Sequence, residues 1–238
     1  MKCRTVFLIT IGVIFCCECT YSQTSLTGSS KEWLTSKSCQ PPCWVSNLQM
    51  GITDVKSGIA LLRVNPLVSD VKVVSSQNTR IAGSSGQVSW LWAGQNYTTK
   101  EGMIPLSQMN VIEYFDGLSN PIDKLSLYFP EGFILSDVVA KFGEPRFIFV
   151  ITLKEEHINA IQFIYDDKGF LLQLILDNSK LDDNLNGEVK LNSVTAFYPA
   201  SLAGLYQMGY PKDRIIKWSG WLSFNDYYRL TKAVSSQP

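Results

Sequence analysis

The chain has 238 residues, of which 21 are basic, 21 are acidic and one is histidine, and 45% are apolar. This apolar content is sufficient for a buried core and excludes a wholly disordered chain. Zero net charge argues against a nucleic-acid-binding protein, which needs a basic face to displace counterions from phosphates. A single histidine excludes zinc centres that need several.

Residues 1–22 have the pattern of a secretory signal peptide. Lys2 and Arg4 precede a short apolar run, and Thr20 and Ser22 place small residues before a cleavage point at Gln23. The apolar run is short for a membrane span, and an N-terminal membrane anchor is the alternative. We therefore expect an exported protein, either secreted or anchored to the outer face of the cell membrane.

Cysteines in this first segment raise the alternative of a lipoprotein. Cys17 and Cys19 are the candidate lipidation sites, because they follow the apolar run and precede a stretch rich in Ser, Thr and Gly that is typical of a tether. Neither has the small preceding residue that a bacterial lipobox prefers. A free and a lipid-anchored form both stay open.

Only two of the six cysteines, Cys39 and Cys43, belong to the mature chain beyond this segment. They follow a polar linker over residues 23–38 and enclose two prolines, which forbid a regular helix. In an oxidising compartment two neighbouring cysteines most simply form a disulfide. A redox site is disfavoured, because three residues separate them and no helix begins at the first cysteine.

Next along the chain, the pattern predicts an amphipathic helix and then a series of strands. The helix covers residues 54–64, with Thr53 as its N-cap and Asn65-Pro66 as its end. Short apolar runs separated by turn residues, including a predicted turn at 83–86, then predict strands at 71–74, 88–92, 108–115 and 124–129.

A second cycle of helix and strands follows, and then a partial third cycle. Ser136 caps a predicted helix over residues 137–142, which Gly143 ends. A hairpin turn at 166–169 joins two of the strands. The remaining predicted elements are strands at 146–153, 158–165, 170–176 and 189–198, a helix at 202–208 and a strand at 214–218.

The segments 135–148 and 202–215 share a pattern of helix, Gly-x-Pro and strand, which indicates duplication of one unit. Convergence on common helix-stop chemistry is the alternative. We expect an α+β fold with short helices packed on antiparallel sheet. Two related units are expected in tandem, 39–129 and 130–238, the second ending in an aromatic segment.

Two stretches carry a resemblance to known families. Gly51-Ile-Thr53 with its helix, and Gly132 through Gly143-Glu-Pro145, resemble the repeats of outer-membrane-assembly lipoproteins and of the β-lactamase-inhibitor-protein-like superfamily. The Cys43-Trp44 opening and the Trp218-Ser-Gly-Trp221 ending are also similar to uncharacterised exported proteins of Chloroflexus-like bacteria. The resemblance implies a non-catalytic protein that binds other proteins through its sheet face. Asn65-Pro66 departs from the pattern, because Gly-x-Pro is expected there.

One loop is a weak candidate for binding calcium. Asp182, Asn184 and Asn186, followed by Gly187, occupy the first, third, fifth and sixth positions of a calcium loop. The twelfth position is Ser193 instead of the glutamate that would bind through both oxygens. Asn, Asp and Gly are also ordinary loop residues, and we expect no metal centre.

The aromatic residues near the C-terminus offer a candidate ligand surface. Their flat side chains, if exposed, suit a carbohydrate or a polypeptide, and the alternative is that they cover an open sheet as core. The residues concerned are Trp218, Trp221, Tyr227 and Tyr228.

Catalytic groupings are missing from the sequence. His157 lies in a charged break between two predicted strands, the chain has no Gly-x-Ser-x-Gly motif, and the adjacent Asp166 and Asp167 point apart. We expect no cofactor and a non-enzymatic protein that contacts a protein partner at the cell envelope. A binding module for a carbohydrate or another small ligand is the alternative, and a hydrolase with an unrecognised site is a third.

Overall fold

A computed structural model of the chain describes residues 48–66, 68–77, 84–92, 110–114, 118–153 and 158–235. The predicted signal peptide and linker, the candidate lipidation sites Cys17 and Cys19, the pair Cys39 and Cys43, and His157 lie outside the described residues. Predictions about them stay predictions.

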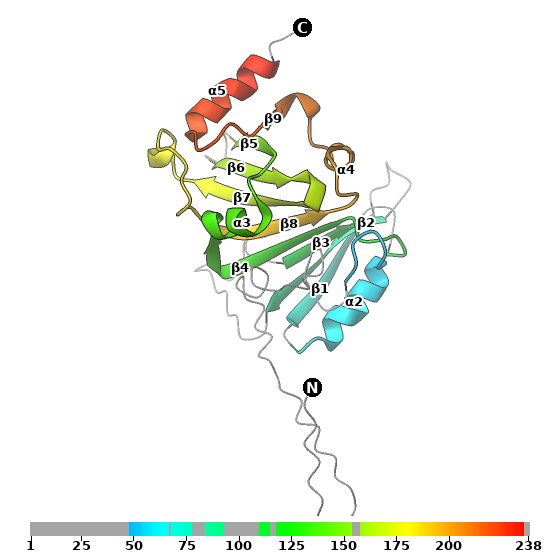
Figure 1. Ribbon diagram of the computed structural model, residues 1–238. Coiled ribbons are helices and arrows are strands. Elements are labelled where there is room, and N and C mark those ends of the chain that lie inside the picture. The colour runs from blue at the N-terminus through cyan, green and yellow to red at the C-terminus, as the bar shows by residue number, and fades with distance from the viewer. Residues whose placement is uncertain are drawn as a thin grey trace, which may run out of the picture.

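Nine strands form a single antiparallel sheet in the order β1-β2-β3-β4-β8-β7-β6-β5-β9 (Figure 1). Every pair of neighbouring strands is antiparallel. The strands are β1 (Val68–Gln77), β2 (Ser84–Trp92), β3 (Asn110–Tyr114), β4 (Lys124–Ile134), β5 (Phe147–Leu153), β6 (Ile158–Tyr165), β7 (Phe170–Leu176), β8 (Lys190–Phe197) and β9 (Ile215–Lys217).

Four α-helices accompany the sheet in the described part of the chain, and the predicted α+β class is confirmed. They are α2 (Val55–Val64), α3 (Leu135–Phe142), α4 (Leu202–Gln207) and α5 (Phe224–Ser235).

The sheet consists of two halves with the same order of elements. In each half one helix precedes four antiparallel strands, namely α2 before β1–β4 and α3 before β5–β8. The last strands of the halves, β4 and β8, pair at the centre of the sheet, where Lys124 lies opposite Phe197. Residues of α2, of α3 and of strands from both halves share one hydrophobic core. The two halves therefore form one packed body, and the expected boundary between residues 129 and 130 lies inside β4.

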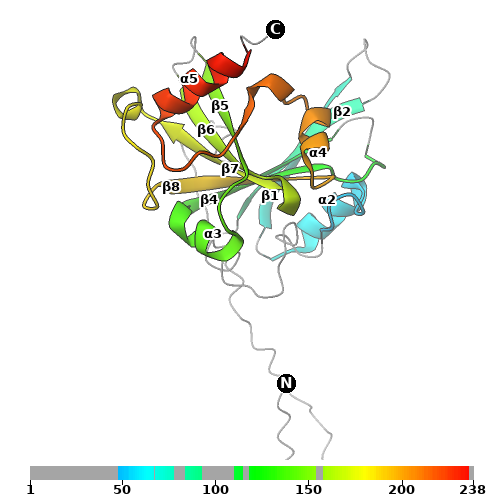
Figure 2. The same cartoon turned by 45° about the horizontal axis from the view of Figure 1, so that its top comes forward.

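The opposite face of the second half has a smaller core of its own. Alternate residues of a strand point to opposite faces of a sheet, so that Ile148 and Val150 join the main core while Phe149 lies on the other side. There Phe149 packs with α4 through Leu205 and with Tyr210. Figure 2 shows α4 on the opposite side of the sheet from α3. The third cycle therefore differs from the first two, because its helix covers the other face.

Helix starts differ from the prediction at two points. Asp54, and not Thr53, caps α2, because its Oδ1 accepts a hydrogen bond of 2.8 Å from the Ser57 backbone N–H. The helix α3 begins at Leu135, and Ser136 is not its cap. Its first backbone N–H groups instead donate to the carbonyls of Gly187 and Val189, a long-range contact that replaces a side-chain cap.

Three further elements were predicted wrongly or missed. Residues 84–86, predicted as part of a turn, belong to β2 and pair with β1. The strand β4 continues through residues 130–132, because an irregularity between Tyr128 and Phe133 accommodates the break in register. The helix α5 was not predicted, although Ser223 and Asp226 form the hydrogen-bonded pair typical of a helix start.

Candidate interaction surface

The C-terminal aromatic residues pack against one another and against the sheet. The Trp218 ring is stacked on Tyr227 with 5.9 Å between ring centroids, and it meets Trp221 edge-on at 5.4 Å. Tyr227 is fully buried, while Trp218, Trp221 and Tyr228 are half-buried and pack on the main core. These side chains therefore act as core between α5 and the sheet, which is the alternative that the sequence left open.

The hydroxyl of Tyr227 forms hydrogen bonds within the protein. Its hydroxyl accepts a hydrogen bond of 3.3 Å from the Ser219 backbone N–H and donates one to the Gly220 carbonyl. Burial raises the pKa of Tyr227 to about 12, and the Glu144 carboxylate adds to this effect. The hydroxyl consequently stays protonated at neutral pH and holds the segment before α5 in place.

The candidate calcium loop contacts the segment that begins α5. Asp182 Oδ1 accepts a hydrogen bond of 2.7 Å from the Asn225 side chain, and Asn184 forms a β-bridge with Ser223. Asn186 Oδ1 accepts from the Glu188 backbone N–H of the same loop at 2.9 Å. No cluster of three or more His, Cys, Asp or Glu side chains suited to a metal ion occurs within the described ranges.

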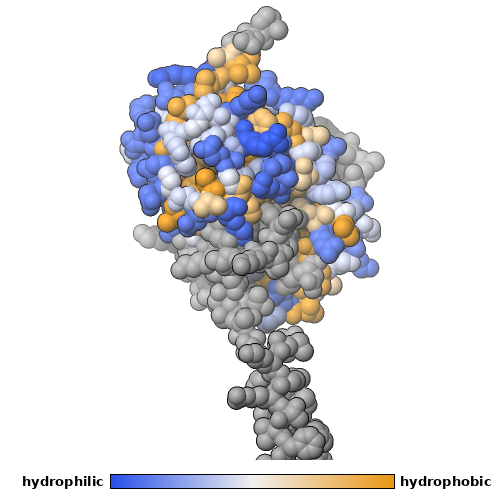
Figure 3. Space-filling model, viewed as in Figure 1, coloured by the Kyte–Doolittle hydropathy of each residue, from blue (hydrophilic) through white to orange (hydrophobic). Residues whose placement is uncertain are grey.

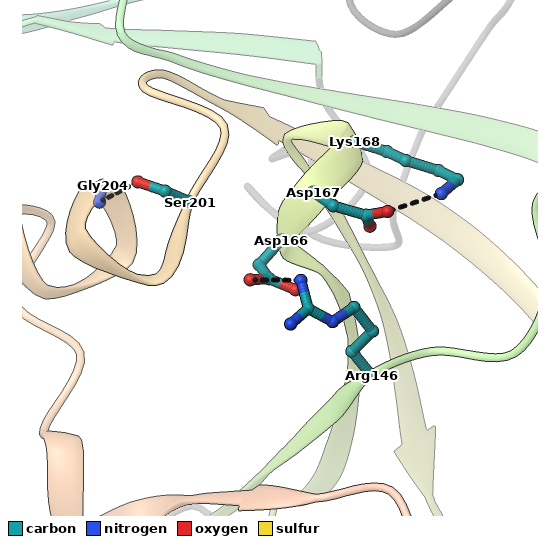
Figure 4. Close-up of polar contacts among 6 residues, drawn as sticks. All are labelled: Arg146, Asp166, Asp167, Lys168, Ser201 and Gly204. Atoms are coloured by element: carbon teal, nitrogen blue, oxygen red, sulfur yellow. Dashed lines mark hydrogen bonds and ion pairs between the residues drawn. The ribbon is translucent and has the colours of Figure 1, made fainter.

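The adjacent carboxylates Asp166 and Asp167 take different partners (Figure 4). Asp166 is buried and its Oδ2 lies 3.2 Å from Arg146 Nη1, whereas Asp167 pairs with Lys168 at 2.8 Å on the surface. Arg146 directly precedes β5, and its carbonyl also accepts from the Trp218 backbone N–H. The Arg146–Asp166 pair thus connects the start of β5 to the β6–β7 turn.

Three exposed apolar residues stand on segments that meet near the N-terminal end of α2, and we call them the loop patch. They are Ile52, Leu118 and Tyr198, with exposed fractions of 73%, 37% and 51%. Backbone hydrogen bonds bring their loops together: Gly51 donates to Ile122, Lys56 to Leu118 and Tyr198 to Asp123, all at 2.8 to 2.9 Å. Figure 3 shows hydrophobic surface over the region of α2, and separately over α5.

The Tyr198 side chain is half exposed, and its ring lies directly against the Gly51 backbone. Gly51 has a φ of +71°, and a Cβ built on it would lie 2.5 Å from the Tyr198 ring. Only glycine fits this position, for the backbone conformation and for the contact with the ring. The ring therefore rests on the Gly51 backbone, with its other side open to solvent.

Two aspartates, Asp54 and Asp123, lie in the segments that carry the loop patch. Hydrogen bonds from the Ser57 side chain and backbone N–H hold the pKa of Asp54 below its ordinary value. Asp123, whose carbonyl accepts from Tyr198, has a pKa raised by burial. An apolar centre with a polar rim is the usual arrangement of protein interaction surfaces.

Sequence reasoning missed the loop patch, because its residues lie far apart in the chain. Gly51 and the exposed Ile52 stand in a predicted helix entry, and nothing local connects them with Tyr198. Their proximity follows from the long-range pairing of β4 with β8.

In the described part of the chain no helix is both long and apolar enough to cross a membrane. No family model, curated protein or solved structure matches this chain.

Proposed function

We propose that this chain is a non-enzymatic, exported protein of the cell envelope, secreted or lipid-anchored, which acts by binding another protein through the loop patch. The observation that carries the proposal is the Tyr198 ring, which is half exposed and lies against the Gly51 backbone. Tyrosine is enriched among the residues that dominate binding energy at protein interfaces. Its side chain has few rotatable bonds, so that it loses little conformational entropy on binding.

The neighbouring residues support the same function. Ile52 is the neighbour of Gly51 in the chain, and the exposed Leu118 lies in the loop whose carbonyls accept from the Gly51 and Lys56 backbone N–H groups. Contact of this area with a partner would remove apolar surface from water. Carbohydrate binding by the C-terminal aromatics has less support, because these rings are occupied with one another and with the core.

The test compares capture of envelope proteins by the exported chain and by two variants. Tyr198→Ala removes the ring, and we expect the affinity for the captured partner to fall by at least about thirtyfold, as for a central interface residue. The matched control is Ile175→Ala, which removes an exposed apolar side chain on β7, outside the loop patch. We expect its affinity to stay within about twofold of the unmodified chain.

Two results would contradict the proposal. Equal losses for Tyr198→Ala and Ile175→Ala would show that the loop patch has no special part in binding. Binding on a glycan array, with no protein partner recovered from the envelope, would favour a carbohydrate-binding module instead. Circular dichroism of each variant establishes that a loss of binding is not a loss of fold.

A further inference from the structure

Asp123 lies beside Tyr198, the aromatic residue of the loop patch. Lys124 of β4 pairs with Phe197 of β8, and the Tyr198 backbone N–H donates to the Asp123 carbonyl at 2.8 Å, so that the ladder continues by one pair. Residues opposite each other in an antiparallel ladder project to the same face, with their Cβ atoms about 5 Å apart. The Asp123 carboxylate and the Tyr198 ring are therefore neighbours, although the two residues are far apart in the chain.

No cation from the described part of the chain occupies this place. Asp123 takes part in none of the ion pairs of the described ranges, and no lysine or arginine there lies over the Tyr198 ring. Lys124 pairs instead with Glu113 at 2.7 Å, and as the next residue along the strand it projects to the other face. Burial raises the pKa of Asp123, and the charge of Lys124 does not offset this effect.

The other charges on the segments of the loop patch balance one another. Asp54 and Lys56 lie at the start of α2 and carry opposite charges, and Lys124 is neutralised by Glu113. Asp123 is therefore the carboxylate whose charge these segments leave uncompensated, and it stands next to the half-exposed ring. A partner that contacts the loop patch would bring its own groups against both.

A carboxylate beside an aromatic ring suits a cation, and a guanidinium group suits it best. The planar guanidinium stacks on an aromatic face and donates two parallel hydrogen bonds to a carboxylate. The ammonium group of lysine is a strongly hydrated point charge without this flat shape. Arginine is also enriched among the residues that dominate binding energy at protein interfaces.

We propose that the loop patch recognises a segment of its partner protein that carries an arginine next to an apolar residue. The guanidinium lies on the open side of the Tyr198 ring and donates hydrogen bonds to the Asp123 carboxylate. Ile52 and Leu118 supply the exposed apolar surface for the neighbouring residue. This inference rests on the proposed function and adds to it the chemistry of the partner.

The test measures binding of the exported chain to two peptide surfaces that differ in one side chain. One carries the peptide acetyl-Gly-Leu-Arg-Leu-Gly, and the other carries citrulline in place of arginine, which keeps the shape and loses the charge. Dense immobilisation raises the effective concentration, so that a weak single contact is measurable. We expect the arginine surface to bind at least about tenfold more tightly.

Substitutions in the chain separate the two contacts of the guanidinium. Asp123→Asn should lower the affinity for the arginine surface about fivefold and leave the citrulline surface unchanged. Tyr198→Leu should lower it about fivefold, whereas Tyr198→Phe should keep it, because a phenyl ring also attracts a cation. Asp137→Asn, a matched change of an exposed aspartate on α3, should stay within about twofold. Circular dichroism checks the fold of each variant.

Three results would overturn this inference: equal binding to the arginine and citrulline surfaces, binding to neither, or an unchanged affinity in Asp123→Asn. The proposed function has a separate readout. Capture of an envelope protein that needs Tyr198 but not Asp123 would leave the proposed function standing and refute the arginine contact. An arginine preference that needs Asp123, together with capture that Tyr198→Ala does not weaken, would contradict the proposed function alone.

Discussion

The two halves of the sheet share one order of elements but are completed differently. In the first half α2 and β1–β4 stand without further helices in the described ranges, and the edge strand β1 has two exposed valines. In the second half α4 covers the opposite face, β9 pairs with the edge, and α5 packs on the main core. The two halves thus share a framework of one helix with four strands, and in the second half the C-terminal segment covers surfaces of this framework.

Three tyrosines with raised pKa values are buried in the second half and in the segment that covers it, and their effect on stability depends on pH. Burial raises the pKa of Tyr210 and Tyr227 to about 12, and it raises that of Tyr165 further still, whereas an ordinary tyrosine titrates near 10. All three pack in the second half or in the segment that covers it. Tyrosines with raised pKa values in the folded state stabilise it below pH 10, and this contribution is lost as the pH rises toward 12.

The largest expected effect is therefore alkaline unfolding. We expect each of the three tyrosines to remove up to about 1.4 kcal/mol from the free energy of unfolding per pH unit above pH 10. Urea denaturation measured at intervals from neutral pH to pH 12 gives this slope. Tyr227→Phe should reduce the slope. If the slope of the Tyr227→Phe variant were unchanged, Tyr227 would not contribute to the loss of stability above pH 10.

The fold was largely predictable where local signals set the boundaries. Gly143, with a φ of +83°, ends α3 as its position after the helix predicted, and Ser201 caps α4. The strands β6 and β7 match their predicted ranges because two mostly apolar runs flank a clear turn, where Gly169 adopts a left-handed conformation.

The rest depends on contacts between distant residues. The carbonyls of Gly187 and Val189 start α3 in place of a side-chain cap, and no local pattern encodes them. The loop patch has the same origin, because Tyr198 reaches Gly51 only after the two halves have paired. The sequence also does not decide whether the aromatic residues near the C-terminus are exposed or buried. The burial of Tyr227 depends on how α5 packs against the sheet.

Gly58 in α2 and Gly204 in α4 differ in how much room each leaves for an added side chain. A Cβ added at Gly204 in α4 would lie 2.1 Å from the Pro199 carbonyl oxygen, which belongs to the backbone. At Gly58 in α2 the nearest atom is the terminal Cδ1 of Ile122, at 2.9 Å. The first neighbour cannot move without shifting α4, whereas the second is the end of a flexible side chain.

We therefore expect Gly204→Ala to lower the free energy of unfolding by about 3 kcal/mol, as overpacking does. Gly58→Ala should stay within about 1 kcal/mol of the unmodified chain, because the helix propensity of alanine offsets the contact with Ile122. Urea denaturation of both variants measures the difference. If both variants lost the same free energy of unfolding, the two helices would tolerate an added methyl group equally, and the predicted difference would be wrong.

The smallest expected effect concerns one ion pair in each half. In the first half Lys124 and Glu113 lie 2.7 Å apart across two strands, with both side chains partly exposed. In the second half Arg146 is 55% exposed, but its partner Asp166 is only 8% exposed, and Asp166 Oδ1, the oxygen that Arg146 does not reach, has no hydrogen-bond partner in the described part of the chain. Removing the cation leaves a partly exposed carboxylate in the first case and a buried one in the second.

Arg146→Ala should accordingly cost about 2 kcal/mol, less than a fully buried pair because water reaches the arginine, and Lys124→Ala less than about 1 kcal/mol. Adding Asp166→Asn to Arg146→Ala should recover part of the loss, since a neutral amide is buried more easily than an unpaired carboxylate. Adding Glu113→Gln to Lys124→Ala should recover little. Urea denaturation of the four variants measures these free energies. A recovery of equal size in the two halves would mean that the burial of Asp166 does not make its ion pair different from the Lys124–Glu113 pair.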